Sequence, residues 1–513
     1  MRAAQLKAVL PRELLASVVV FLVALPLCMG IAIASGMPPA KGLITGIIGG
    51  LVVGWLAGSP LQVSGPAAGL AVLVFELVRQ HGVAMLGPIL LLAGFLQLVA
   101  GRLRLGCWFR VTAPAVVYGM LAGIGVLIVL SQVHVMLDGV PKPSGLDNLS
   151  GLPTTVTQAL PTLGGGLGWQ AGLLGLSTIL VMGLWENFRP QSLRFIPGAL
   201  LGVGLATLAS LALALNVKRV EVPANLAEAI DWLKPADLLN LADPNLLIAA
   251  FAVAFIASAE TLLSAAAVDR MHSGERSDFD RELSAQGVGN MLCGLVGALP
   301  MTGVIVRSSA NVQAGAKTRL SAILHGVWLL AFVLLLSSVL QSIPVASLAG
   351  VLVYTGVKLV DLKAFRGLAR YGRMPMFTYA ATALAIIFSD LLTGVLIGFG
   401  LTLAKLAWKA SRLKISLIDL PAASQMELRL VGAATFLKVP ALTRVLGAIP
   451  VGTTVHVPLN NLSYIDHSCL ELLEEWGRAN ASKGSKLLIE ARGLKRRLEG
   501  RLRTTVGVGS VKA

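Results

Sequence analysis

Charged side chains are scarce in this sequence of 513 residues. Asp, Glu, Lys and Arg make up 13% of it, against about 25% in a typical soluble domain. Acidic residues are the rarer sign, with 26 Asp and Glu against 42 Lys and Arg and a net charge of +16. Because the basic residues lie mainly between hydrophobic runs, we attribute them to membrane topology and expect no nucleic-acid partner. The composition excludes an ordinary soluble protein.

Motifs for covalent or metal-dependent catalysis are missing as well. The sequence has no H-E-x-x-H motif, no Walker-type loop and no nucleophile–base arrangement. The four cysteines, Cys28, Cys107, Cys293 and Cys469, are scattered without a C-x-x-C pair, and we interpret them as buried apolar side chains. We therefore expect no enzyme activity and no cofactor.

Long apolar runs, in contrast, recur along most of the chain. Segments of membrane-helix character begin near residues 14, 42, 66, 85, 111, 169, 195, 246, 283, 304, 319, 346, 376 and 391. In two sets of seven, the third of each set is short, at "QVSGPAAGLAVLV" (62–74) and "MTGVIVRSS" (301–309). Short segments at matching places are typical of transporters built from inverted repeats. We predict an α-helical polytopic domain over 1–415, with repeats at about 12–216 and 244–410.

The loop charges predict the orientation of these segments. With the N-terminus inside, the expected inner loops hold 14 Lys and Arg, and the outer loops hold six. The positive-inside rule then places both termini in the cytoplasm.

After residue 415 the sequence pattern changes to that of a soluble domain. "MELRLVG", "TTVHVPLNNL" and "KLLIEA" have the alternation of strands, and 439–448, 468–481 and 494–503 have that of helices. We predict a small cytoplasmic α/β domain over 424–513.

The two short segments have the features of an anion site. Gly65 and Pro66 interrupt the first, and Gly303 precedes the second. A helix that begins inside the bilayer presents unpaired N–H groups and about half a positive charge. We predict helix N-termini at Ala67 and Val304 that together hold an anion. The binding residues expected here are Ser64, Gly65, Pro66, Ala67, Ala68, Gly303, Val304, Ile305 and Arg307.

Two charged residues fall at membrane depth, where an Arg costs roughly 2.5–3.5 kcal/mol on insertion scales. Arg307 lies about one turn into the second short helix, as an anion ligand or as a structural residue paired with a carboxylate or carbonyls. Glu260 lies in the middle of the eighth span with Ser264 one turn further. We predict that Glu260 and Ser264 together hold a coupling ion, either H+ or Na+. The alternative is a structural Glu260–Arg307 salt bridge.

Together these motifs resemble the sulfate permease (SulP) family of anion transporters. "LPRELLASVVVFLVALPLCMGIAIASGMPP", "SGPAAG" and "RSSANVQAGAKTRLSAI" resemble its first, third and tenth spans. "LNNLSYIDHSCLELL" (459–473) resembles the core motif of the STAS domain that usually ends these chains. The first span and "AETLLS" (259–264) look closest to bicarbonate-transporting bacterial members.

The resemblance implies seven plus seven inverted helices in core and gate domains, elevator-type transport and often a homodimer. It also implies the bacterial plasma membrane and a substrate between half-helices 3 and 10. Leu27 stands where many relatives have Gln, which suits a small anion. Val304 and Ile305 replace the small and hydroxyl residues of the family's sodium site, so H+ and Na+ stay equal candidates.

In the STAS motif, His467 follows Asp466 where phosphorylatable relatives have Ser, so a serine switch is not expected, even at Ser468. A cytoplasmic partner is an open expectation for this domain. The basic tail 492–503 is either a solvated helix face or a contact with anionic lipid.

We hypothesise a secondary transporter of a small inorganic anion, with bicarbonate favoured. The alternatives are sulfate or dicarboxylate/H+ symport, an uncoupled channel and a STAS-linked membrane sensor or scaffold.

Overall fold

The computed structural model describes residues 3–106, 114–142, 144–160, 168–190, 193, 196–223, 226–239, 243–410, 412–420 and 424–490. The chain divides into two compact units, Met1–Phe399 and Gly400–Ala513, and each is described by itself. Cys107 and the tail 492–503 lie outside the described residues.

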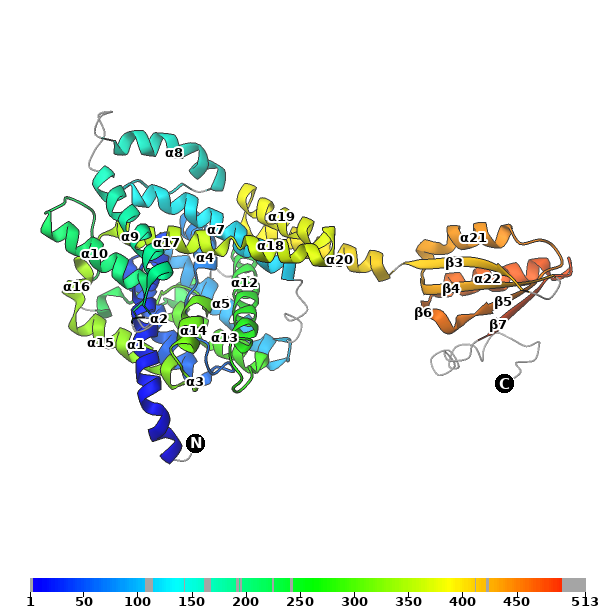
Figure 1. Ribbon diagram of the computed structural model, residues 1–513, viewed down its shortest axis with the longest axis horizontal. Coiled ribbons are helices and arrows are strands. Elements are labelled where there is room, and N and C mark those ends of the chain that lie inside the picture. Colours follow the sequence, from blue (N-terminus) through cyan, green and yellow to red (C-terminus); the bar gives the residue numbers. More distant parts are fainter. Residues whose placement is uncertain are drawn as a thin grey trace. The chain divides into compact units, whose positions relative to one another are not determined.

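The first unit is largely helical (Figure 1), and its described residues include two very short strands. Its elements up to the second short strand are α1 (Ala3–Ala34), α2 (Pro39–Ile48), the π-helix η1 (Gly49–Val53), α3 (Gly54–Leu56), β1 (Ser64–Pro66), α4 (Ala68–His81), α5 (Val83–Arg102), α7 (Pro114–Met136), α8 (Gly145–Ala159), α9 (Gly168–Phe188), α10 (Gly198–Ala212), η4 (Leu226–Ala229), α11 (Pro235–Leu239), α12 (Pro244–Asp269), α13 (Phe279–Leu295) and β2 (Met301–Gly303). The remainder are α14 (Ile305–Gln313), α15 (Leu320–Leu335), α16 (Ser337–Gln341), α17 (Val345–Leu359), α18 (Leu362–Leu368), η6 (Ala369–Tyr371), α19 (Arg373–Phe388) and α20 (Leu391–Ala410), which continues into the second unit.

These helices follow the predicted spans closely. From the second expected span onward, each predicted start lies within four residues of the start of a helix. Among the described residues, eight helices are long and apolar enough to cross a membrane, and three further apolar helices are shorter. The count of 14 spans and the two repeats stay predictions. Helix α8 and the π-helical turn η1 were not predicted.

Glycine pairs let the backbones of neighbouring helices approach closely. A Cβ built on Gly94 of α5 would lie 2.5 Å from the carbonyl oxygen of Gly287 on α13, and the reverse contact would be 2.6 Å. Gly87 and Gly294 repeat this arrangement two turns away. Small residues at helix contacts are the usual way in which membrane helices pack. Helix α13 is therefore seated tightly against α5, which matters for the site below.

Over the described residues 412–420 and 424–490, the second unit is a five-stranded sheet with two α-helices. Its elements are β3 (Leu413–Asp419), β4 (Gln425–Ala434), η7 (Phe436–Lys438), α21 (Val439–Gly447), β5 (Thr454–Pro458), η8 (Leu459–Asn461), β6 (Leu462–Ile465), α22 (His467–Ala481) and β7 (Lys486–Glu490). The strand order is β3-β4-β5-β7, with β6 also on β4. Strand β3 is antiparallel to β4, and the other pairs are parallel.

Two details of this unit differ from the sequence pattern. Strand β3 pairs with β4 along its whole length, ahead of the expected start at residue 424, and the domain bounds stay a prediction. The segment "TTVHVPLNNL" holds one strand and a 3-10 turn, and a separate strand, β6, follows. Asp466 caps α22 by accepting the N–H of Cys469 at 2.9 Å, and neighbouring His467 pairs with Glu471 at 3.0 Å.

Candidate functional site

The short strands β1 and β2 bring the two interrupted segments together. They pair antiparallel, with Ser64 opposite Gly303, Gly65 opposite Thr302 and Pro66 opposite Met301. Each strand leads at once into a helix, α4 from the N-cap Ala67 and α14 from the N-cap Val304. Both N-termini therefore lie at the predicted residues. We call β1 with α4 the first arm, and β2 with α14 the second arm.

The first turn of each arm's helix offers backbone N–H groups for a ligand. Ala67 and Val304 have no polar side-chain atom that could cap these groups, and in both N-caps the backbone is extended. Ala68, Val304 and Ile305 are each partly exposed, while Ala67 is buried. Such N-termini attract anions through their N–H groups and their dipoles. The second arm presents this surface between apolar side chains.

Glu260 on α12 lies at the N-terminus of the first arm's helix. The backbone N–H of Gly69 donates to its carboxylate. A Cβ built on Gly69 would lie 2.7 Å from Oε2 and 2.9 Å from Oε1, so only glycine allows this approach. Oε2 is buried without a hydrogen-bond partner among the described residues. Ser264, one turn along α12, is buried. The arrangement can bind and release a proton within the arm.

Arg307 on α14 lies behind the first arm. It is 0% exposed, and a Cβ on Gly65 would lie 2.2 Å from its Nη1. Its charge acts on the Cys28 thiol of α1 and the His325 ring of α15. The guanidinium lies within hydrogen-bonding reach of the Cys28 thiol, and within the described part of the chain no other partner is found for its three nitrogens. The alternative of a Glu260–Arg307 salt bridge is not seen among the described residues.

The structure gives two of the predicted ligands a different environment. The hydroxyl of Ser64 accepts a hydrogen bond from Gln286 Nε2 at 2.6 Å, so it is already engaged by α13. Leu27 on α1 is buried at 4% exposure, next to Cys28. Gly65, Pro66 and Gly303 are buried in the paired strands. The N–H of Val304 is engaged as well, because it donates to the carbonyl of Val63 at 2.9 Å. As direct ligands, these six predicted residues have less support than Ala68 and Ile305.

Several polar residues that hold the arms were missed by sequence reasoning. Thr261, next to Glu260, accepts the N–H of Gly303 at 3.1 Å, and its carbonyl accepts Gln62 Nε2 at 3.1 Å. Ser308 accepts the N–H of Val63 at 2.9 Å and donates to the carbonyl of Val304 at 2.7 Å. The only signal for them in the sequence was the presence of a polar side chain within an apolar span.

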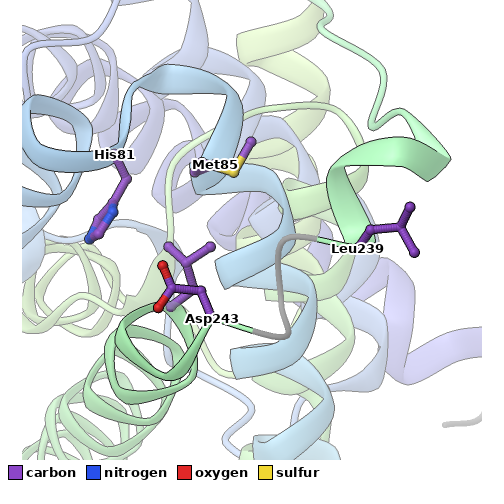
Figure 2. A pocket seen from close by; sticks show the side chains of 5 residues that line it. His81, Met85, Leu239 and Asp243 are labelled. Carbon is purple, nitrogen blue, oxygen red and sulfur yellow. The ribbon is translucent and has the colours of Figure 1, made fainter.

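A separate pocket of about 380 Å³ opens at the far end of the first arm's helix. His81, Met85, Leu239, Asp243 and Leu246 line it (Figure 2). His81 is the last residue of α4, so at 1.5 Å per residue the pocket lies about 20 Å along the helix from Ala67. It is therefore distinct from the N-terminal site.

Comparison with known proteins identifies the family. The model of the sulfate permease family matches residues 10–382. The chain belongs to the sulfate permease family. The bicarbonate transporter BicA of Synechocystis sp. is 28% identical over 376 residues, which cover 70% of this chain and 63% of BicA. YvdB of Bacillus subtilis, named as a proposed sulfate transporter, is 29% identical over 393 residues, or 75% of this chain and 72% of YvdB.

Solved structures of related transporters share the fold. The transmembrane domain of a cyanobacterial BicA aligns with a TM-score of 0.65 at 26% identity, over 75% of this chain and 97% of that one. Murine Solute Carrier 26 family member A9, in its inward-facing state, aligns with a TM-score of 0.78 over 96% of this chain and 87% of that one. At 14% identity, the second likeness concerns the fold alone. The chain is a multi-pass, helical anion transporter, and its relatives are transporters rather than enzymes.

Proposed function

We propose that this transporter is a secondary active symporter of a small inorganic anion, with bicarbonate as the favoured substrate and a proton on Glu260 as the coupling ion. One observation carries the proposal. The Glu260 carboxylate lies against Gly69 in the first turn of α4 and accepts its backbone N–H, a donor that an anion would otherwise use. The second arm, where α14 begins at Ile305, has no such carboxylate among the contacts of the described residues and is the other half of the anion site.

Competition for the first arm couples the two ions. While Glu260 is ionised, it repels an incoming anion and keeps the Gly69 N–H engaged. Protonation removes that charge, so the anion gains both an amide donor and relief from repulsion. Binding of each ion then favours binding of the other by the same factor, as linkage requires. Arg307, buried behind Gly65, supplies a fixed positive field for the anion in both states.

A proton fits this site better than a sodium ion does. Sodium needs several oxygen ligands, and Val304 and Ile305 at the start of α14 provide no side-chain oxygen. The Gly69 N–H also points at Glu260 and would repel a metal cation there. On α12, the side-chain oxygens within that turn belong to Glu260, Ser264 and Thr261, and the hydroxyl of Thr261 already accepts the N–H of Gly303. Na+ would therefore depend on backbone carbonyls.

The favoured substrate rests on the apolar surroundings of the anion site. The side chains of Val304 and Ile305 offer no hydrogen bonds, which suits a small, singly charged anion better than a large divalent one. Relatives named for bicarbonate and for sulfate are both similar to this chain, so sulfate or a dicarboxylate is the second candidate.

The remaining proposals concern the setting of the transporter. We propose elevator-type movement of a core domain holding both arms, in a homodimer in the bacterial inner membrane, with cytoplasmic termini. For the second unit we propose a STAS domain over about 413–513. Its parallel strands β4, β5 and β7 and the capped helix α22 support this.

Uptake into proteoliposomes tests the function directly. Labelled bicarbonate, sulfate and succinate would each be offered with an inward proton gradient, with an inward sodium gradient and with neither. Protein-free liposomes measure the leak of CO2. We expect bicarbonate uptake that responds to the proton gradient and not to sodium.

Other outcomes would redirect the proposal in specific ways. Sulfate or succinate uptake in place of bicarbonate would keep the proton site and replace the substrate. Uptake driven by sodium alone would overturn the proton assignment. Flux that ignores both gradients would indicate an uncoupled channel.

A further inference from the structure

One face of α13 carries polar side chains in the interior of the membrane unit. Glu282, Gln286 and Asn290 are spaced four residues apart, so they lie in line along the helix. Each is 0% exposed. None of them was predicted to act, and buried polar side chains at such depth are costly unless they have partners. Their partners therefore indicate what the face is for.

The first two of these residues hold the chain that leads into the first arm. The Glu282 carboxylate accepts the N–H of Ser59 at 2.9 Å and a hydrogen bond from Gln286 at 3.0 Å. The N–H of Gly58 donates to it as well. Gln286 in turn donates to Ser64 Oγ in β1 at 2.6 Å. Helix α13 thus fixes strand β1 and its approach.

Asn290 holds the second arm through side-chain hydrogen bonds to the N–H and the carbonyl of one residue, as the backbone of a neighbouring strand would. Its Oδ1 accepts the N–H of Met301 at 2.7 Å, and its Nδ2 donates to the carbonyl of the same residue at 3.2 Å. Nδ2 also donates to Gln97 Oε1 on α5 at 2.7 Å, and Gln97 donates to Ser258 on α12 at 3.2 Å. One side chain therefore anchors β2 through both backbone groups of a single residue.

We infer that the Glu282–Gln286–Asn290 face of α13 is the positioning element that sets the two arms, and hence their helix N-termini, at the spacing an anion requires. The strands that precede those N-termini are only three residues long, so their own pairing gives little rigidity. Helix α13 holds both strands and is itself locked to α5 by glycine pairs such as Gly94 with Gly287. The consequence for anion affinity rests on the proposed function.

Misplacing the arms should weaken anion binding strongly, because their backbone N–H groups stabilise an anion only at hydrogen-bonding distance. A displacement of about 1 Å at a preorganised site can cost up to about 100-fold in activity. A positioning residue should therefore change anion affinity without touching the anion.

Asn290→Asp tests this with nearly unchanged size. One Asp oxygen still accepts the Met301 N–H, but the other faces the Met301 carbonyl and Gln97 Oε1 and repels both. Asn148→Asp is the matched control, since Asn148 bonds both backbone groups of Lys142, each at 2.8 Å, and the carbonyl of Ser144 at 2.8 Å, away from the arms. Hydrogen exchange and uptake kinetics would be measured on the full-length chain of each variant.

In Asn290→Asp we expect faster exchange in 61–70 and 301–310 together, and an anion KM about tenfold higher. In Asn148→Asp exchange should rise only near 138–150, with KM within about twofold of the parent. If Asn290→Asp does not fold, Glu282→Gln is measured in the same way. Because Glu282 holds Ser59 and Gln286, we then expect faster exchange at 58–66, with the same rise in KM.

Exchange that rises at 61–70 or 301–310 alone, or no more than in the control, would overturn the positioning role. So would loosened arms with an unchanged KM. If the parent protein transports none of the tested anions, the proposed function fails by itself, and the exchange measurement still decides whether α13 positions the arms.

Discussion

The two arms are built alike but differ in charge. Each consists of a three-residue strand followed by a helix with an apolar N-cap. Glu260 of α12 lies against Gly69 of the first arm, and Arg307, which belongs to the helix of the second arm, lies against Gly65 of the first arm. The second arm presents only Val304 and Ile305 beside its N–H groups. The first arm is therefore suited to control binding, and the second to contribute a constant share of it.

The largest expected effect comes from filling the contact between Glu260 and the first arm. In Gly69→Ala the new methyl group would lie 2.7 Å from Glu260 Oε2, so the carboxylate must move or α4 must shift. We expect uptake to fall by about 100-fold, as for misplaced catalytic groups. Initial rates in proteoliposomes at matched protein content measure this.

Gly204→Ala on α10 is the control for this substitution. No atom lies within 4 Å of a Cβ built there, and Ala stabilises a helix by about 1 kcal/mol over Gly. Its uptake should equal that of the parent. Equal rates for Gly69→Ala and Gly204→Ala would show that the close approach of Glu260 has no role.

Glu260→Gln separates binding from coupling. Gln resembles the protonated acid, so the first arm would stay permanently permissive. We expect anion exchange to continue at high external pH, where the parent slows, while accumulation driven by a proton gradient falls at least tenfold. Exchange and net uptake, each measured from pH 5.5 to 8.5, check this. A variant with the parent's pH profile and accumulation would remove Glu260 from coupling.

Arg307→Gln tests the fixed field behind the first arm. A buried cation without a carboxylate partner among the described residues is costly to the fold, so we expect the variant to melt at an equal or higher temperature. Loss of the positive field should raise the anion KM about tenfold, since a net contribution of about 1.4 kcal/mol corresponds to that factor. The melting temperature in detergent and the anion KM from uptake kinetics, measured on the same variant, test these two expectations. A lower melting temperature with an unchanged KM would make Arg307 a structural residue.

Sequence alone predicted the arms but not their supports. Gly65, Pro66 and Gly303 mark helix interruptions by local backbone chemistry, so both N-termini could be placed. The surroundings of Arg307 could not be predicted, because α1, α15 and β1 meet there only in the fold. Ser64 was expected to bind the anion for its hydroxyl, yet Gln286, 222 residues away, engages that group.

The α13 face shows where the limit lies. The spacing of Glu282, Gln286 and Asn290 was visible as a helical line of polar residues, and it could have predicted a buried polar face. Which strands this face would contact depends on contacts far apart in sequence. Strand β3 was missed for a related reason, because its extent is defined by pairing with β4 and its sequence looks like the end of a linker.

The smallest expected effect concerns the bond that joins the arms across their strands. Ser308 on the second arm accepts the Val63 N–H from the chain entering the first arm. Ser308→Ala leaves that buried N–H unsatisfied, which costs about 1–3 kcal/mol, so denaturant or thermal unfolding should show a loss of stability. Because Asn290 and Gln286 still hold both strands, the anion KM should change less than about threefold. Ser309→Ala, one residue along α14 with an exposed hydroxyl that bonds within its own helix, is the control. A KM change as large as that of Asn290→Asp would mean that Ser308, rather than α13, sets the spacing of the arms.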